Sequence, residues 1–214
     1  MIIAVDGPTA SGKGTISKRL AEHFRLPCLD TGLLYRAVGW TVKQFDGDPD
    51  NAADALKACQ FSDDLLNDHV LRSENIGSYA SKVSVHPMVR AALDKRQRDF
   101  ANQSGGAVLD GRDIGTVIAP DADAKLFVTA SAEARAVRRF EEMKSRGEAV
   151  NFDDILADIL KRDERDQNRA TAPLKPAEDA DLLDTTELTI DAAVRQAIAL
   201  VNAKLSRRRD KDPA

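Results

Sequence analysis

The segment GPTASGKGT, residues 7–15, places three glycines, a lysine and a threonine directly after the apolar opening MIIAVD. Closely spaced glycines let the backbone turn its N–H groups inward, where they can hold phosphate oxygens. Lys13 would add a positive charge for the outer phosphates, and the N-terminus of a helix that starts there would favour anions. We therefore predict a phosphate-binding loop between a strand that ends at Asp6 and a helix. The alternative is a glycine-rich turn that binds nothing.

The residue after the lysine distinguishes classes of phosphate-binding protein. GTP-dependent switch proteins place the magnesium-binding hydroxyl directly after this lysine, whereas Gly14 separates Lys13 from Thr15 here. The run Gly-Lys-Gly-Thr is typical of nucleoside monophosphate kinases. A switch protein would also carry an Asn-Lys-x-Asp motif for guanine, and the sequence has none. These two observations favour a kinase over a nucleotide-dependent switch.

Charged residues continue the apolar face of a predicted helix from about Phe152 to Arg169. At 100° per residue, the apolar positions of its first half share one face, and Arg162, Asp166 and Arg169 lie on the same face. Charges that face a core must be paired or must face a ligand. Two guanidiniums and one carboxylate leave an anion unaccounted for, and guanidinium matches phosphate oxygens bidentately. We therefore expect a ligand at this face; the alternative is an internal Arg–Asp–Arg salt bridge.

The segment TGLLYR, residues 31–36, follows a short predicted strand. The carboxyl ends of strands in an α/β sheet border the binding crevice, so Thr31, Tyr35 and Arg36 are expected at the site. Arg36 has the chemistry of a phosphate contact. Thr31 could instead serve only as the N-cap of the helix that follows, and this alternative stays open.

In the segment LDGRDIG, residues 109–115, Asp110 ends a buried strand. A carboxylate at this position is expected to organise a magnesium ion. Arg112 and Asp113 project from the loop beyond the strand. A simple Asp-Gly turn would explain Asp110 and Gly111, but it would not explain the two charged residues that follow.

Short apolar runs alternate with helical periodicity along the chain. Strands are predicted at residues 2–5, 107–110, 124–128 and 182–184. Alternating strands and helices imply an α/β fold in which helices flank a parallel sheet on both faces. The segment of about 36–103 is mostly helical, and we interpret it as an insertion within a single domain that spans the whole chain.

The composition of the 214 residues excludes several classes of protein. The two cysteines, Cys28 and Cys59, make no disulfide framework. The histidines have no Cys or His partners at metal-ligand spacing, which excludes a zinc site; they are His23, His69 and His86. A net charge of −4 provides no global field for nucleic acid. The start of the chain resembles no secretory signal, and no apolar run suits a membrane helix, so a cytoplasmic protein is expected.

Four motifs together resemble the bacterial cytidylate kinases: DGPTASGKGT, LDTGLLYRA, LDGRDIGTV and RDERDQNRA. They occur in the order of that family, and the similarity covers most of the chain. The resemblance implies a P-loop kinase fold with a monophosphate-binding insert at about 36–103 and a small lid at about 138–150. It implies transfer of the γ-phosphoryl group of ATP to CMP and dCMP, with Mg²⁺. One departure is the insert, which is short after Phe61, where many members carry an extra strand-rich stretch.

The resemblance also assigns roles to residues. The catalytic residues would be Lys13, Arg112, Arg162 and Arg169. ATP would be bound by Gly7, Pro8, Thr9, Ala10, Ser11, Gly12, Lys13, Gly14, Thr15, Arg138 and Arg139. CMP would be bound by Thr31, Tyr35, Arg36, Ser81, Arg90, Arg112, Asp113, Arg162, Asp166 and Arg169. Magnesium would be held by Thr15 and Asp110. Alone, Ser81 and Arg90 would be ordinary polar helix residues, and the arginines of the lid could belong to a solvated helix.

The phosphate and the cytosine ring of the acceptor nucleotide place different demands on the site. A phosphate monoester has a second pKa of about 6, so it is already an anionic nucleophile at neutral pH and needs no catalytic base. Positive charge and exclusion of water are what the transfer requires.

Cytosine offers an N4 amino donor where uracil offers an acceptor, so a carboxylate beside that edge selects cytosine. Asp113 is the candidate for this carboxylate, with Arg90 and Ser81 completing the contact.

Two other functions compete with this interpretation. The first is a related kinase that acts on another monophosphate, on shikimate or on a sugar, although no base for a hydroxyl acceptor stands out. The second is the non-enzymatic switch, which the loop spacing disfavours. The expected partners are small nucleotides, with no nucleic acid and no membrane, and the expected state is a monomer.

Overall fold

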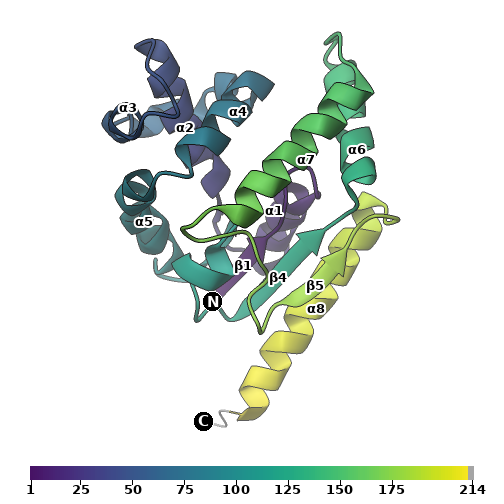
Figure 1. Cartoon of the computed structure of the whole chain (residues 1–214). Helices are drawn as coiled ribbons and strands as arrows, with labels where there is room; N and C mark the ends of the chain where they lie inside the picture. Colours follow the sequence, from purple (N-terminus) through teal and green to yellow (C-terminus); the bar gives the residue numbers. More distant parts are fainter. Residues whose placement is uncertain (212–214) are drawn as a thin grey trace.

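Five strands form one parallel sheet in the computed structural model, which describes residues 1–211 (Figure 1). The strands are β1 (Ile2–Asp6), β2 (Cys28–Asp30), β3 (Ala107–Gly111), β4 (Ala124–Thr129) and β5 (Asp181–Asp184). Their order in the sheet is β2-β3-β1-β4-β5, and every pairing is parallel. The predicted α/β architecture is thereby confirmed. Because β1 is central, the loop that follows it lies in the middle of the carboxyl edge.

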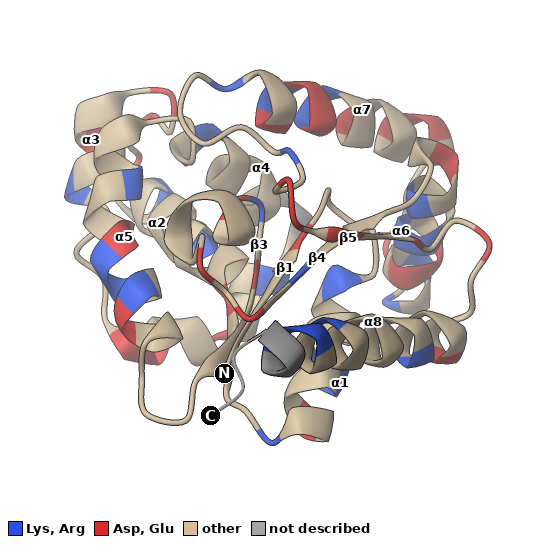
Figure 2. Cartoon of the chain, turned by 90° about the horizontal axis from the view of Figure 1, so that it is seen from below, with Lys and Arg blue, Asp and Glu red and all other residues tan. Residues whose placement is uncertain are grey.

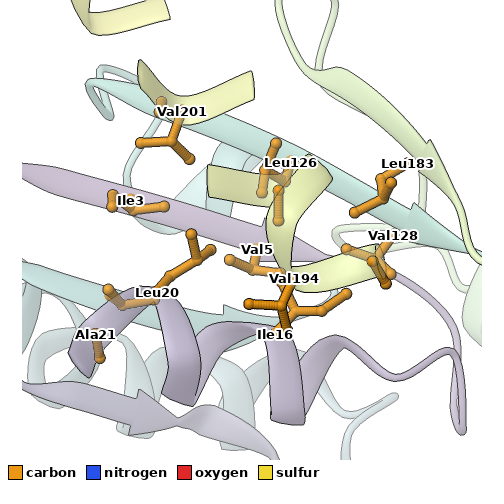
Figure 3. Close-up of a cluster of buried hydrophobic side chains, with 14 residues drawn as sticks. Ile3, Val5, Ile16, Leu20, Ala21, Leu126, Val128, Leu183, Val194 and Val201 are labelled. Carbon is orange, nitrogen blue, oxygen red and sulfur yellow. The ribbon is translucent and has the colours of Figure 1, made fainter. Parts of the chain in front are cut away.

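Helices α1 (Lys13–Phe24) and α8 (Ile190–Lys211) cover one face of the sheet. Figure 3 shows Ile16 and Leu20 of α1 packed with Val194 and Val201 of α8 over the buried side chains of the strands. These positions are spaced by four residues in α1 and by seven in α8, the spacing that places side chains on one helix face. The apolar periodicity of the sequence therefore faces this core.

The opposite face of the sheet is covered by α5 (Pro87–Ala101) and by the π-helical turn η3 (Ile114–Ile118). Ala4 of β1 packs here, whereas its neighbours in the strand pack against α1 and α8. This alternation follows from the two-residue period of a strand.

The predicted insert is helical, and the described residues between β2 and β3 include no strand. It contains α2 (Thr31–Gln44), α3 (Ala52–Lys57), the 3₁₀ turns η1 (Asp63–Asn67) and η2 (His69–Arg72), α4 (Glu74–Val83) and α5. Helix α2 begins at Thr31, five residues before the predicted start of the insert. Asp30 is its N-cap and accepts a 3.0 Å hydrogen bond from Gly32 N. The alternative in which Thr31 caps the helix is therefore wrong.

Helices α6 (Ala132–Ser145) and α7 (Phe152–Asn168) pack against each other through Ala136, Met143, Ile155 and Ile159. In Figure 1, α7 lies between the helices of the insert and α6. The predicted lid boundary at about residue 138 falls inside α6, because this helix starts six residues earlier. Figure 2 shows acidic and basic residues interspersed along α5 and α7. None of the helices within residues 1–211 combines the length and the apolar composition that crossing a membrane requires.

Candidate active site

A cavity of about 360 Å³ lies where β1, β2 and β3 end, and it extends between the insert and α7. The carboxyl edge of a parallel sheet is the usual ligand position in α/β folds. The structure brings most of the predicted site residues to this cavity. Those that line it are Thr9, Ala10, Gly12, Lys13, Gly14, Thr15, Thr31, Tyr35, Arg36, Ser81, Arg90, Asp110, Arg112, Asp113, Arg139, Arg162, Asp166 and Arg169.

Four predicted residues lie outside this lining. Gly7 and Pro8 are buried at the start of the loop. Ser11 and Arg138 line a second cavity of about 400 Å³, which shares loop residues with the first. The guanidinium of Arg138 donates to the carbonyl of Thr185 and, at 3.0 Å, to its hydroxyl. Arg138 is therefore directed at the loop after β5.

The conformation of the glycine loop depends on two of its glycines. Gly7 has φ 155°, and a Cβ there would lie 2.0 Å from the carbonyl oxygen of Val128. Gly12 is the N-cap of α1 with φ 88°, in the left-handed region that favours glycine. Lys13 is the first residue of α1. The backbone therefore turns as the sequence pattern predicted, and its N–H groups stand at a helix N-terminus.

Lys13 and Asp110 face each other across the cavity floor. Their Nζ and Oδ1 atoms are 3.6 Å apart, and their side chains are 12% and 5% exposed. Burial lowers the pKa of Lys13, and Arg112 adds to this effect. Burial raises the pKa of Asp110 to about 6, although Lys13 opposes the shift. Keeping both buried groups charged therefore costs free energy. Asp110 Oδ1 has no hydrogen-bond partner among the described residues.

Two aspartates connect the loop after β3 to other elements. Asp166 of α7 accepts a 3.0 Å hydrogen bond from Arg112 Nε. Asp113 forms an ion pair with Arg90 of α5 and another, at 3.4 Å, with Arg169 at the end of α7. Burial by itself would raise the pKa of Asp166, but Arg112 and Arg162 outweigh it and hold the pKa below its usual value. The charged stripe of α7 is therefore joined to a different element, and its pairs are not confined to the helix.

Strand β3 extends through Gly111, which pairs with Asp6 of β1. The alternative of an Asp-Gly turn at Asp110 is therefore wrong. Thr31 donates its hydroxyl hydrogen to the carbonyl of Asp110 at 2.8 Å. This bond holds the start of α2 against the end of β3.

The remaining predicted residues belong to the insert side of the cavity. Arg90 lies over the ring of Tyr35, with 5.5 Å between the guanidinium carbon and the ring centroid. Ser81 is buried and accepts a 2.7 Å hydrogen bond from Arg165 of α7. Arg36 donates from Nη1 to the carbonyls of Leu71, at 2.7 Å, and Ser73, at 2.9 Å. The insert therefore orients the guanidinium of Arg36 through its own backbone.

Sequence reasoning missed Arg135 in the stretch from which Arg138 and Arg139 were chosen. Arg135 is buried and forms a bidentate pair with Asp163 of α7, at 3.0 and 2.5 Å. Its Nη1 also donates to the carbonyl of Thr9 in the glycine loop, at 3.3 Å. The sequence signal was that Arg135 lies among small apolar residues on the buried face of its helix. Its partner could not be inferred, because Asp163 lies 28 residues away.

Comparisons with known proteins agree on one family. The model of the family described as Cytidylate kinase matches residues 3–203. A protein of Mesorhizobium japonicum named cytidylate kinase is 55% identical over 207 residues, which are 96% of each chain. A protein of Methylocella silvestris with the same name is 52% identical over an alignment of 217 positions that covers 100% of each chain. A solved structure of an uncharacterized protein from Eubacterium ventriosum has a TM-score of 0.57 at 17% identity and covers 95% of this chain and 99% of that one, a likeness of fold alone.

Proposed function

The chain belongs to the cytidylate kinase family, and from this premise we propose how its residues carry out the reaction. The enzyme transfers the γ-phosphoryl group of ATP to CMP and produces CDP and ADP. We further propose that dCMP is accepted in the same site. One observation carries the assignment of residues: a single cavity collects the glycine loop, Lys13 and the arginines that a reaction between two polyanions requires.

We assign the donor nucleotide to the loop from Gly7 to Thr15. Its backbone N–H groups and the N-terminus of α1 would hold the phosphates of ATP. Lys13 would place its ammonium group between donor and acceptor. Burial lowers the pKa of Lys13, and the negative charge of ATP would favour its cationic form.

Asp110 and Thr15 fit the requirements of a magnesium ion. The buried Oδ1 of Asp110 has no hydrogen-bond partner among the described residues, and Thr15 is exposed at the same cavity. No group of three acidic, Cys or His side chains that could hold a metal occurs within residues 1–211. Phosphate oxygens and water would therefore complete the coordination, as is usual for Mg²⁺. The ion would neutralise charge on the transferred phosphoryl group.

The acceptor phosphate needs positive charge more than it needs a base. Its second pKa is about 6, so CMP already carries a nucleophilic oxygen at neutral pH. Arg36, Arg112, Arg162 and Arg169 all line the cavity and would surround this phosphate. Asp166 would contact the ribose while it holds Arg112 in place through their 3.0 Å bond. The arginines would bring two anions together and stabilise the charge of the transition state.

The cytosine base would bind at Asp113, Arg90 and Ser81, which are all buried at the insert side of the cavity. The carboxylate of Asp113 would accept a hydrogen bond from the N4 amino group. Uracil presents an oxygen at this position, so the same carboxylate would repel it. The ion pairs of Asp113 with Arg90 and Arg169 hold the carboxylate in place for this role.

We propose that α6 and α7 act as the lid, with Arg139 approaching the ATP phosphates. The bond from Arg135 to the carbonyl of Thr9 supports a coupling between this lid and the glycine loop. Closure would exclude water and prevent hydrolysis of ATP. We also propose a monomer that binds neither nucleic acid nor membrane; the interspersed charges on α5 and α7 support the absence of a basic surface there (Figure 2).

An assay of ADP release tests the proposed function. The enzyme is given ATP and Mg²⁺ with CMP, dCMP, UMP, AMP or shikimate in separate reactions. CMP should have the highest kcat/KM, dCMP should be accepted, and chelation of Mg²⁺ by EDTA should stop the reaction. A preference for another acceptor would contradict the assignment of the base site.

A further inference from the structure

Asp6 is a buried carboxylate at the end of β1 that the proposed chemistry does not use. Its exposed fraction is 5%. Its Oδ1 accepts a hydrogen bond from Ile114 N and its Oδ2 accepts one from Gly115 N, both at 2.8 Å. Each carboxylate oxygen therefore holds one backbone N–H of η3, a segment more than 100 residues away in the sequence.

The two N–H groups are the first two of η3. The first N–H groups of any helical turn lack acceptors within the turn and are usually capped by the residue before it. That residue is Asp113, whose side chain makes no capping hydrogen bond. Its carboxylate instead pairs with Arg90 and Arg169. Asp6 thus caps η3 from another strand, and Asp113 remains available to the cavity.

Both ends of η3 are held by charged side chains. At the far end, Arg98 of α5 donates to the carbonyls of Val117, at 2.7 Å, and Ile118, at 3.0 Å. At the near end, Gly115 packs closely against Asp6 and Lys125, since a Cβ there would lie 3.4 Å from Asp6 Oδ2 and 3.2 Å from a carbon of Lys125. The turn is therefore held in one position with respect to β1.

The capped N–H of Ile114 belongs to the peptide bond that follows Asp113. The peptide bond is planar, so the N–H of Ile114 and the carbonyl of Asp113 have a fixed relative orientation. The hydrogen bond to Asp6 therefore orients the carbonyl of Asp113 and restricts its backbone. Arg112 precedes Asp113 directly. We propose that Asp6 is a positioning residue that holds Asp113 and Arg112 in the geometry for binding CMP. This inference rests on the proposed role of Asp113 at the cytosine base.

The charge environment of Asp6 supports a role in positioning rather than in stability. Burial raises its pKa to about 7, the two backbone hydrogen bonds oppose this, and nearby Asp113 and Asp110 add to the increase. A neutral residue of the same size would avoid this electrostatic cost. Above this pKa the ionised carboxylate has one property that an amide lacks, which is two acceptor oxygens for two N–H donors.

The variant Asp6→Asn isolates this property. It keeps the shape, but its NH₂ group would face one of the two backbone N–H groups, so one bond is lost. We expect kcat/KM for CMP to fall by about tenfold or more, in the range of one lost hydrogen bond to a charged group. The ratio of kcat/KM for CMP to that for UMP should narrow, and KM for ATP should stay within about twofold of the wild type. The melting temperature should be unchanged or higher.

Asp123→Asn is the matched control. Asp123 Oδ2 accepts a 2.7 Å hydrogen bond from Ile2 N at the opposite end of β1, outside the cavity. The same chemical change there should leave all kinetic constants unaltered.

Three results would overturn the inference. They are unchanged CMP kinetics in Asp6→Asn, an equal loss for CMP and UMP, or a fall in melting temperature with wild-type kinetics. A failure of the proposed function is distinguishable, because the wild type itself would then not prefer CMP to UMP. If Asp113→Asn narrows the preference and Asp6→Asn does not, only the role of Asp6 is refuted.

Discussion

Replacing Lys13 by methionine should separate the chemistry of this residue from its contribution to folding. Methionine keeps an unbranched apolar stem of similar length and removes only the ammonium group. The side chain of Lys13 is 12% exposed and lies 3.6 Å from Asp110 Oδ1. Lys13→Met therefore removes one charge from the cavity and leaves no large void.

The effect on folding should be small. At an effective dielectric constant of about 20, two charges at the 3.6 Å separation of Lys13 and Asp110 attract by about 5 kcal/mol. Desolvation opposes this attraction, and it is the larger effect at both residues, because the pKa of Lys13 is lowered and that of Asp110 is raised to about 6. Without the lysine, Asp110 can take up a proton instead of remaining as an unpaired charge. We expect the free energy of unfolding to change by about 1 kcal/mol or less.

The effect on turnover should be large. Loss of a single preorganised contact to transition-state charge costs about 3–4 kcal/mol, which is about 10²- to 10³-fold in kcat. The assay is ADP release at saturating ATP, Mg²⁺ and CMP, together with a thermal melt of each protein. Lys18→Met on the exposed side of the same helix is the control and should behave as the wild type. A kcat within about tenfold of the wild type would refute the assignment of Lys13 as a transition-state contact, and a large fall in melting temperature would show that its role is structural.

Three further predictions follow from the ion pairs and pKa shifts. Asp113→Asn should lower kcat/KM for CMP, and the ratio of kcat/KM for CMP to that for UMP should fall by about 5- to 150-fold, the effect of about 1–3 kcal/mol at a base contact. An equal loss of kcat/KM for both nucleotides would exclude a role of Asp113 at the base. Arg169→Lys keeps the charge but loses the planar fork, so KM for CMP should rise about tenfold, whereas unchanged kinetics with a lower melting temperature would make Arg169 structural. The folded protein retains the proton of Asp6 up to about pH 7, whereas the unfolded chain loses it near pH 3.8, so this residue makes stability fall as pH rises through that window. The free energy of unfolding, measured with urea at pH 5 and 7.5, should therefore change less with pH for Asp6→Asn than for the wild type. An equal change in both proteins would show that Asp6 does not titrate between these two pH values.

The sequence by itself determined the features that depend on neighbouring residues. The left-handed turn at Gly12 is a local conformation that glycine permits. The apolar spacing of Ile16 and Leu20, and the short apolar runs before and after them, determined which faces are buried and hence the parallel sheet. The motifs also identified the family: three of them lie at the ends of β1, β2 and β3, and the fourth lies at the end of α7.

Only the tertiary structure decided which charges meet. Arg112 pairs with Asp166, which is 54 residues away, and Asp6 holds a peptide 108 residues away. Arg138 contacts the loop at Thr185, while Arg135, which the sequence reasoning passed over, contacts the glycine loop. Charged side chains are long, and several partners of opposite sign are compatible with one helix face. The choice among them depends on how the elements pack in space, and residue spacing along the chain carries no information about those distances.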